Sequence, residues 1–150
     1  MDWSWMRPKW KLSKEEESRL VAAIRRAEEG HRGEVLVHLE RKCPGGEPLA
    51  RAAQLFEQLG LRRTAEDTGV ILYVALSDRK AAVYAGQGVH GAAQPGFWQE
   101  VVDALARGFR EGSAVTALEA ALERIGGLLR TAVPGEDTRG NELPNVVSVS

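Results

Sequence analysis

The stretch Gly69-Val-Ile-Leu-Tyr-Val-Ala-Leu76 is apolar without the alternation of a half-exposed strand. This pattern is typical of a β-strand buried on both faces, at the centre of a layered α/β sheet. The turn Ser77-Asp78-Arg79-Lys80 follows, in which Asp78 is able to bond its own backbone, and Ala81-Ala-Val-Tyr-Ala-Gly86 returns as a second strand. The sequence therefore predicts a buried hairpin over 69–86.

Upstream of the hairpin, the sequence predicts a helix, a strand and a second helix. The Ser-x-x-Glu pattern at 13–16 is a capping box that starts the first helix, and Gly30 stops it. Glu34-Val-Leu-Val-His-Leu-Glu40 is short and rich in Val and Leu, which favours a strand. Pro48 suits the first turn of the next helix, which ends at Gly60. Its buried face is expected to carry Leu49, Ala52, Phe56 and Leu59.

Downstream, two apolar stripes at helical spacing predict two further helices between Pro95 and about Val133. Gly112-Ser113 separates them, and Ser113 is expected to cap the second. The predicted order is α-β-α-β-β-α-α in one α/β domain, 13–133, with an N-terminal arm, 1–12, and an extended or mobile tail, 134–150. The stripes are Phe97, Val101, Leu105 and Phe109, then Leu118, Leu122, Ile125 and Leu129.

Composition bounds the function class. Of the 150 residues, 43% are hydrophobic and 27% charged, as in globular proteins, and the net charge of -1 provides no electrostatic footprint for nucleic acid. Cys43 is the single cysteine, so no disulfide can form within the chain. No apolar run approaches the ~20 residues of a transmembrane helix, and no signal peptide is recognisable, so we expect a cytoplasmic protein.

The predicted topology brings three segments to one end of the sheet. Strands joined through a helix are expected to be parallel, and the third strand turns back on the second. Gly33-Glu34, Glu66-Asp67-Thr68 and the loop 86–91 then meet at one rim. Acidic side chains and loop carbonyls are the hard oxygen ligands that calcium or magnesium takes.

Other motifs are weaker. Gly86-Gln-Gly-Val-His-Gly91 matches the spacing of a dinucleotide loop, but the sequence predicts no strand after it. His31, His38 and His90 have no zinc spacing; His38 is expected to be packed inside its strand, and His90, in the glycine loop, is the better functional candidate. Cys43 lacks the local signature of a nucleophile.

The N-terminal arm carries Trp3, Trp5 and Trp10 among the basic residues Arg7, Lys9 and Lys11. Such segments occur at membrane interfaces or on partner proteins. Pro8 disfavours an amphipathic helix. We expect the tryptophans to pack on this domain or on a symmetry mate, and an unknown protein partner is the alternative.

Together these features resemble the TPM domain family, also called the TPM phosphatase family. The resemblance rests on Glu66-Asp67-Thr68-Gly69-Val-Ile-Leu-Tyr-Val, the turn Asp78-Arg79 and the loop Gly86-Gln-Gly-Val, in the same order. The strand 34–40 with Cys43, Phe97-Trp98-Gln99-Glu100 and Asn141-Glu-Leu-Pro144 look like the short bacterial members without a membrane anchor.

The resemblance implies a three-layer α/β/α sandwich and a divalent-cation site, often for calcium, on the acidic edge. Asp67 matches the Asp of the family's D-N-G motif, with Thr68 in place of Asn, and Gly86, Gly88 and Val89 match the glycine loop. Phosphatase activity and a role in membrane-protein maintenance are attributed to the family. The chain departs from many members at His90, where they have a Glu, and in the neutral stretch that follows.

Three hypotheses result. The first is a TPM-type module that binds a divalent cation, calcium before others, through Glu34, Glu66, Asp67, Gln87 and Gly88. The second is a metal-assisted phosphatase that uses the same site, with His90 as proton donor. The third is a protein-interaction module that needs no metal and docks its partner on the tryptophan arm or the acidic edge.

Overall fold

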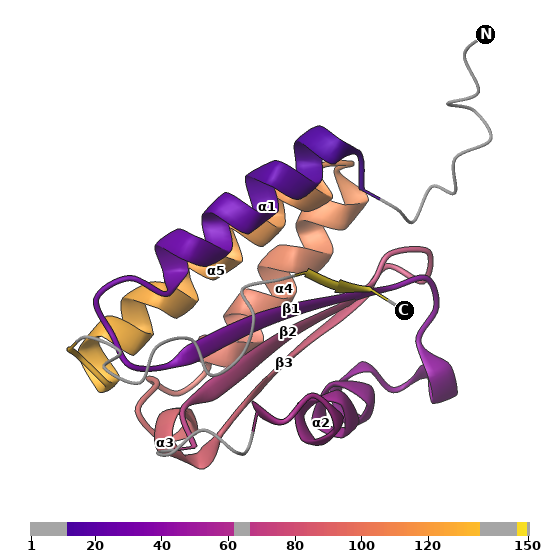
Figure 1. Cartoon of the computed structure of the whole chain (residues 1–150). Helices are drawn as coiled ribbons and strands as arrows, with labels where there is room; N and C mark the ends of the chain where they lie inside the picture. The colour runs from indigo at the N-terminus through magenta and orange to yellow at the C-terminus, as the bar shows by residue number, and fades with distance from the viewer. Residues whose placement is uncertain (1–11, 62–66, 136–146, 150) are drawn as a thin grey trace, which may run out of the picture.

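The computed structural model describes residues 12–61, 67–135 and 147–149, and a mixed sheet with the strand order β3-β2-β1-β4 lies at its centre (Figure 1). β1 is parallel to β2 and to β4, and β3 is antiparallel to β2. Every residue of β1 and β2 is buried, which confirms the predicted hairpin with its central first strand. The strands are β1 (Glu34–Glu40), β2 (Gly69–Ala75), β3 (Lys80–Ala85) and β4 (Val147–Val149).

Helices cover both faces of this sheet. α1, α4 and α5 lie on one face and α2 lies on the other, so the predicted three-layer α/β/α sandwich is confirmed (Figure 1). A short 3₁₀ turn, Pro44–Gly46, leads into α2. The helices are α1 (Lys14–Ala27), α2 (Pro48–Gln58), α3 (Gln87–His90), α4 (Phe97–Arg110) and α5 (Ala114–Ala132).

The alternation of side chains along each strand divides the interior into two cores. On β1, Val35 and Val37 face α1, α4 and α5, whereas Leu36 faces α2. On β2, Leu72 faces α1, α4 and α5, whereas Tyr73 faces α2. Because both faces of β1 and β2 are covered, these strands lack polar alternation in the sequence.

Local sequence signals explain most helix boundaries. Ser13 and Glu16 form the predicted capping box, with N–O distances of 3.1 and 2.9 Å, and Pro48 occupies the first turn of α2. Ser113 stands at the N-cap of α5, but its side chain makes no capping hydrogen bond, contrary to the prediction. The prediction for Leu49 is also wrong: its side chain is 58% exposed, because α2 buries Ala52, Leu55 and Phe56.

Two elements were not predicted. Gln87–His90, expected as an irregular glycine loop, forms the short helix α3. Val147–Val149, within the tail, pairs with β1 in parallel register. Among the described residues, no helix has both the length and the apolarity needed to cross a bilayer.

Candidate functional site

The three segments predicted to meet at one rim of the sheet do lie together there. Glu34 is in register with Gly69, and its N–H donates to the Thr68 carbonyl oxygen over 3.2 Å. On the other side of β2, the Gly86 N–H donates to the Gly69 carbonyl oxygen over 2.8 Å. The parallel pairing of β1 with β2 and the hairpin to β3 therefore produce the rim, as the topology required. Glu66, the remaining predicted rim residue, lies outside the described residues.

Asp67 is held against the start of α3. Its backbone is left-handed, with φ of 53°, and its Oδ2 accepts a hydrogen bond from the Gln87 N–H over 3.0 Å. Its carbonyl oxygen accepts from the Gly88 N–H over 2.9 Å. A Cβ atom added to Gly86 would fall against that carbonyl and 2.5 Å from Oδ1 of Asp67. Asp67 and the glycine loop therefore interlock, and only glycine fits at position 86.

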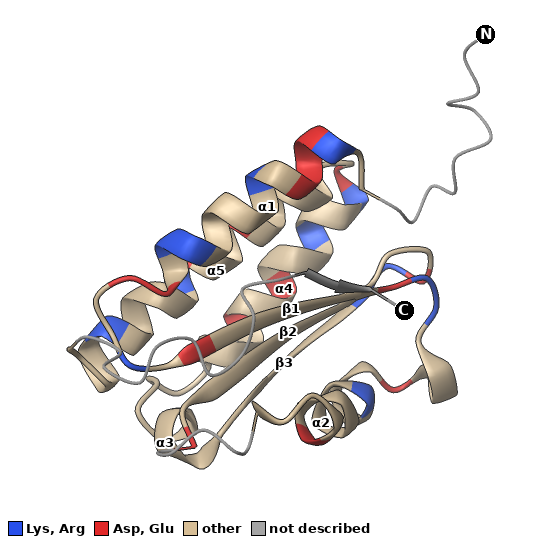
Figure 2. Cartoon of the chain, viewed as in Figure 1, with Lys and Arg blue, Asp and Glu red and all other residues tan. Residues whose placement is uncertain are grey.

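Glu34 is another carboxylate at this end of the sheet, where β1 begins with an acidic residue (Figure 2). Its residue is only 2% exposed, at the first position of β1. A buried carboxylate is costly unless charge or hydrogen bonds compensate it. The rim thus combines a buried acid with an acid fixed by backbone amides.

The donor set agrees with calcium or magnesium in type but is small. Carboxylate oxygens are the hard ligands that both ions take, and calcium needs six or more. Among the described residues, no group of three or more His, Cys, Asp or Glu side chains is arranged to hold a metal. Gln87 and Gly88 direct their N–H groups toward Asp67. Backbone carbonyls elsewhere in the loop, water and Glu66 would have to complete the shell.

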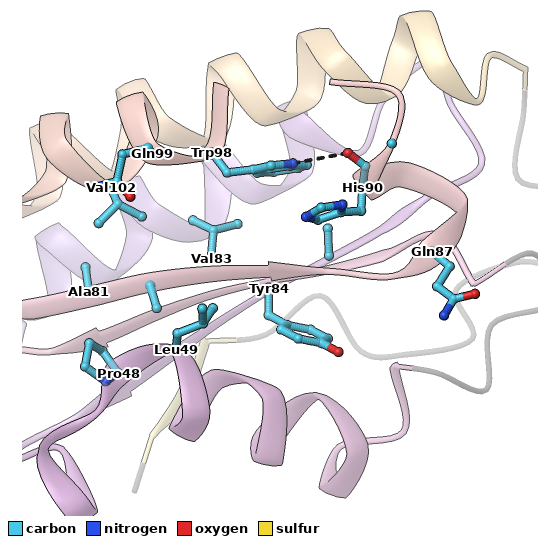
Figure 3. Close-up of a pocket in the computed structure, with 13 residues that line it drawn as sticks. Pro48, Leu49, Ala81, Val83, Tyr84, Gln87, His90, Trp98, Gln99 and Val102 are labelled. Carbon is cyan, nitrogen blue, oxygen red and sulfur yellow. Dashed lines mark hydrogen bonds between the residues drawn. The ribbon is translucent and has the colours of Figure 1, made fainter. Parts of the chain in front are cut away.

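His90 lies at the end of α3 and faces α4. Its ring stacks on Trp98 with centroids 6.4 Å apart, and its carbonyl oxygen is 3.5 Å from the Trp98 indole nitrogen (Figure 3). Both residues line a groove of about 520 Å³ that runs along β3 between α2 and α4. The sequence reasoning missed this groove, because nothing in the sequence marks β3 as the edge strand.

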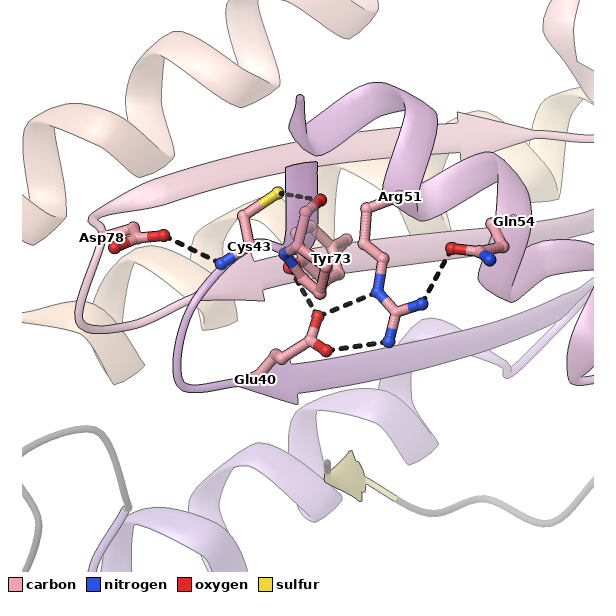
Figure 4. A network of polar contacts seen from close by, with 7 residues as sticks. Glu40, Cys43, Arg51, Gln54, Tyr73 and Asp78 are labelled. Atoms are coloured by element: carbon pink, nitrogen blue, oxygen red, sulfur yellow. Dashed lines mark hydrogen bonds and ion pairs between the residues drawn. The ribbon is translucent and has the colours of Figure 1, made fainter. Parts of the chain in front are cut away.

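A second polar cluster lies at the opposite end of the sheet (Figure 4). Glu40 accepts hydrogen bonds from Arg51 Nη2 at 2.8 Å, Arg51 Nε at 3.1 Å and the Tyr73 hydroxyl at 2.6 Å. Burial, and next the bond to Glu40, raises the pKa of Tyr73. The cluster is closed: Glu40 and Tyr73 are buried, and the thiol of Cys43, also buried, contacts the Pro44 carbonyl. It joins α2 to the sheet.

The two histidines outside the rim are packed inside the fold. His38 is 2% exposed and stacks on Tyr73 with centroids 6.1 Å apart, as expected for a strand residue. His31 accepts from the Gly33 N–H at Nδ1 over 3.0 Å and contacts the Ala27 carbonyl through Nε2. Burial lowers the pKa of both imidazoles. The uncharged rings therefore connect structural elements.

Comparison with known proteins shows that this chain matches one protein family. The model of the TPM domain matches residues 9–128. The chain is similar to the NMR structure of the BA42 protein from the psychrophilic bacterium Bizionia argentinensis, with 31% identity and a TM-score of 0.84 over 97% of this chain and 99% of that one. No curated protein matches.

Two more distant structures share the fold. The N-terminal domain of a protein from P. gingivalis has 21% identity and a TM-score of 0.65, over 81% of this chain and 78% of that one. The N-terminal domain of the cg2496 protein from Corynebacterium glutamicum has 14% identity and a TM-score of 0.62, over 84% and 79%.

Proposed function

Because the chain belongs to the TPM domain family, we propose that it is a binding module for a divalent cation, calcium before others, at the rim. The ligands in this proposal are Glu34, Glu66, Asp67 and the Gln87-Gly88 loop. The observation that carries it is the interlock between Asp67 and residues 86–88, which holds a carboxylate in one orientation before any ion arrives. A preoriented ligand loses less conformational freedom on binding.

The small number of described carboxylates determines how tightly the site is expected to bind calcium. Calcium affinity rises with the number of charged ligands and the rigidity of the site. Asp67 and Glu34, with Glu66 as a third acid, favour a dissociation constant in the weak range, on the order of 10⁻⁴–10⁻³ M. The module would therefore respond to high rather than trace calcium.

Calorimetry and thermal unfolding in calcium test the proposal. The full chain is expected to release or absorb heat on titration and to unfold at a higher temperature in millimolar calcium. Asp67→Asn should abolish both effects while it keeps an oxygen that accepts from the Gln87 N–H. The matched control is Asp103→Asn, an exposed aspartate on α4. A wild-type chain with neither heat nor stabilisation at millimolar calcium would contradict the proposal.

Phosphatase activity is the second candidate, on the same rim. A bound cation would polarise a phosphoryl oxygen, and His90, three residues after Gln87 on α3, would donate a proton. Hydrolysis of an aryl phosphate should then disappear in Asp67→Asn and fall in His90→Ala. Turnover that survives both changes together belongs to a contaminant.

The wider setting is proposed from the family alone. We place the module in the cytoplasm, in the maintenance of membrane proteins or of the cell envelope, either through the cation site or through a metal-independent partner. Fractionation of cells that express the tagged full chain tests the location. Recovery outside the cytoplasm would overturn it.

A further inference from the structure

The groove along β3 has an open strand edge as its floor. β3 is the outermost strand on its side of the described sheet. The Gly86 N–H bonds to the Gly69 carbonyl, so the register makes Ile71–Tyr84 and Tyr73–Ala82 the hydrogen-bonded pairs of the ladder. The N–H and C=O groups of Ala81, Val83 and Ala85 must then point away from β2, into the groove. Such an edge is a template for one more strand.

The walls of the groove differ in chemistry from one end to the other (Figure 3). At the Ala85 end lie the rings of His90 and Trp98. At the Ala81 end lies Gln99, whose amide donates to the exposed Asp103 carboxylate over 2.9 Å. The groove is therefore aromatic at one end, and at the other end the carboxylate of Asp103 lies next to the lining residue Gln99.

The wall opposite α4 is apolar. Leu49, on α2, is the exposed large hydrophobic side chain among the described residues, at 58% exposure, and it lines the groove beside Pro48. Tyr84 points from β3 toward this wall (Figure 3). α2 thus leaves the apolar side chain of Leu49 exposed, next to the outer edge of β3 in the described sheet.

The N-terminal arm changes from aromatic to basic along one face. Alternate residues of an extended chain share a side. After Met1, the odd positions of the arm are Trp3, Trp5, Arg7, Lys9 and Lys11, which change from aromatic to basic. Pro8 falls on the even side, where its missing N–H would face solvent at the new edge.

The arm joins the domain at the end of the sheet where the hairpin turn lies. Leu12, where the arm joins the described domain, packs on the same core cluster as Leu76, at the end of β2 next to the hairpin turn. The start of α1 and that turn lie toward the same end of the domain (Figure 1). Five extended residues span up to about 17 Å. An arm that starts at Leu12 would meet the Ala81 end first and then run antiparallel to β3.

We propose that residues 1–11 occupy the groove of their own domain as a fifth strand, antiparallel to β3. Side chains directly opposite in such a pair share a face of the sheet, and those of Ala81, Val83 and Ala85 face the α4 side. The register pairs Trp3 with Ala85, Trp5 with Val83 and Arg7 with Ala81. It places the two tryptophans beside His90 and Trp98, and the basic residues beside Asp103. This inference is independent of the cation site.

Amide hydrogen exchange in the full chain, followed by NMR, tests the proposal. In the wild type, the amides of Ala81, Val83 and Ala85 are expected to be protected although they point away from β2. The double change Trp3→Ser and Trp5→Ser should accelerate their exchange about tenfold or more, because the arm then opens locally. Asp103→Lys should act in the same direction, and the matched charge change Glu123→Lys on α5 should not. The amides of Ala82 and Tyr84, bonded to β2, serve as the internal control and stay protected.

Two results overturn the inference. Unprotected amides at Ala81, Val83 and Ala85 in the wild type, or protection that both tryptophan changes leave intact, would show that the arm is not the added strand. Protection that rises with protein concentration, in a chain that sediments as a dimer, would overturn the assignment within one chain and give the groove to the arm of a second copy.

Discussion

At the scale of single residues, Gly86 is the position on which the rim depends. The Asp67 carbonyl and Oδ1 occupy the space that any Cβ at 86 would need, and the backbone there is extended, with φ of -66°. The requirement for glycine is therefore one of close approach and not of backbone conformation. The same contact fixes the carboxylate that the proposed cation site uses.

We predict that Gly86→Ala destabilises the domain by about 1–3 kcal/mol, because the methyl group must displace the backbone of Asp67. The same change should weaken any calcium response more than it lowers stability. Urea unfolding of the two proteins measures the difference. Gly91→Ala, in the same loop but with no atom within 4 Å of the added Cβ, is the matched control and should change stability little.

At the scale of elements, the ionic cluster around Glu40 fastens α2 to the sheet. The side chains of Arg51 and Glu40 are 15% and 9% exposed, and their bidentate pair is completed by the Tyr73 hydroxyl. Breaking a pair of this kind leaves one charge buried without compensation, whereas removal of both charges costs less.

We predict that Arg51→Met destabilises the domain by about 1–3 kcal/mol, since Glu40 then loses its cation. Adding Glu40→Gln should recover part of that loss, and the double-mutant cycle measures the coupling. Arg41→Met, at an exposed arginine next to β1, is the control. Equal effects of Arg51→Met and Arg41→Met would show that the pair contributes nothing.

The elements also show how far sequence reasoning extends. α1 and β2 carry local signals, a capping box and an unbroken apolar run, and both were predicted. β4 has three residues, Val147–Val149, and forms through pairing with distant β1, so no local pattern marks it. Leu49 has the spacing of a buried residue, but α2 packs mainly on β2 and β3 and leaves its first turn beside the open edge.

The candidate site could also be predicted from the sequence only in part. The parallel crossover and the hairpin are enough to bring Glu34, Asp67 and the glycine loop to one rim. Nothing in the sequence shows that Gln87 and Gly88 direct their N–H groups toward Asp67, because this depends on the turn into α3. For the same reason the contact between His90 and Trp98 was not predictable.

At the scale of the whole molecule, α3 connects the two surfaces that carry the proposals. Its first residue, Gln87, bonds to Asp67 at the rim, and its last, His90, lines the groove against Trp98. The rim and the groove are therefore neighbours across one helical turn. The cluster around Glu40 lies at the opposite end of the sheet from the rim, where it stabilises the fold.

Whole-domain stability is also expected to depend on pH through two buried histidines. Burial lowers the pKa of His31 and His38 below the ordinary 6.5, so the unfolded chain takes up protons before the folded one does. Their contribution to stability is complete above pH 6.5 and is lost as the pH falls through the folded-state pKa values. The slope has an upper limit of about 1.4 kcal/mol per pH unit for each proton. Urea unfolding between pH 7.5 and 5.5 should therefore show falling stability.

The variant His31→Asn measures how much of this pH dependence of stability comes from the His31 ring. Asparagine can accept from the Gly33 N–H as Nδ1 does, but it takes up no proton in this range. Its stability should be lower than that of the wild type at pH 7.5 and should decline less toward pH 5.5. A wild-type stability that stays level or rises as the pH falls would contradict the neutral, buried state assigned to both rings.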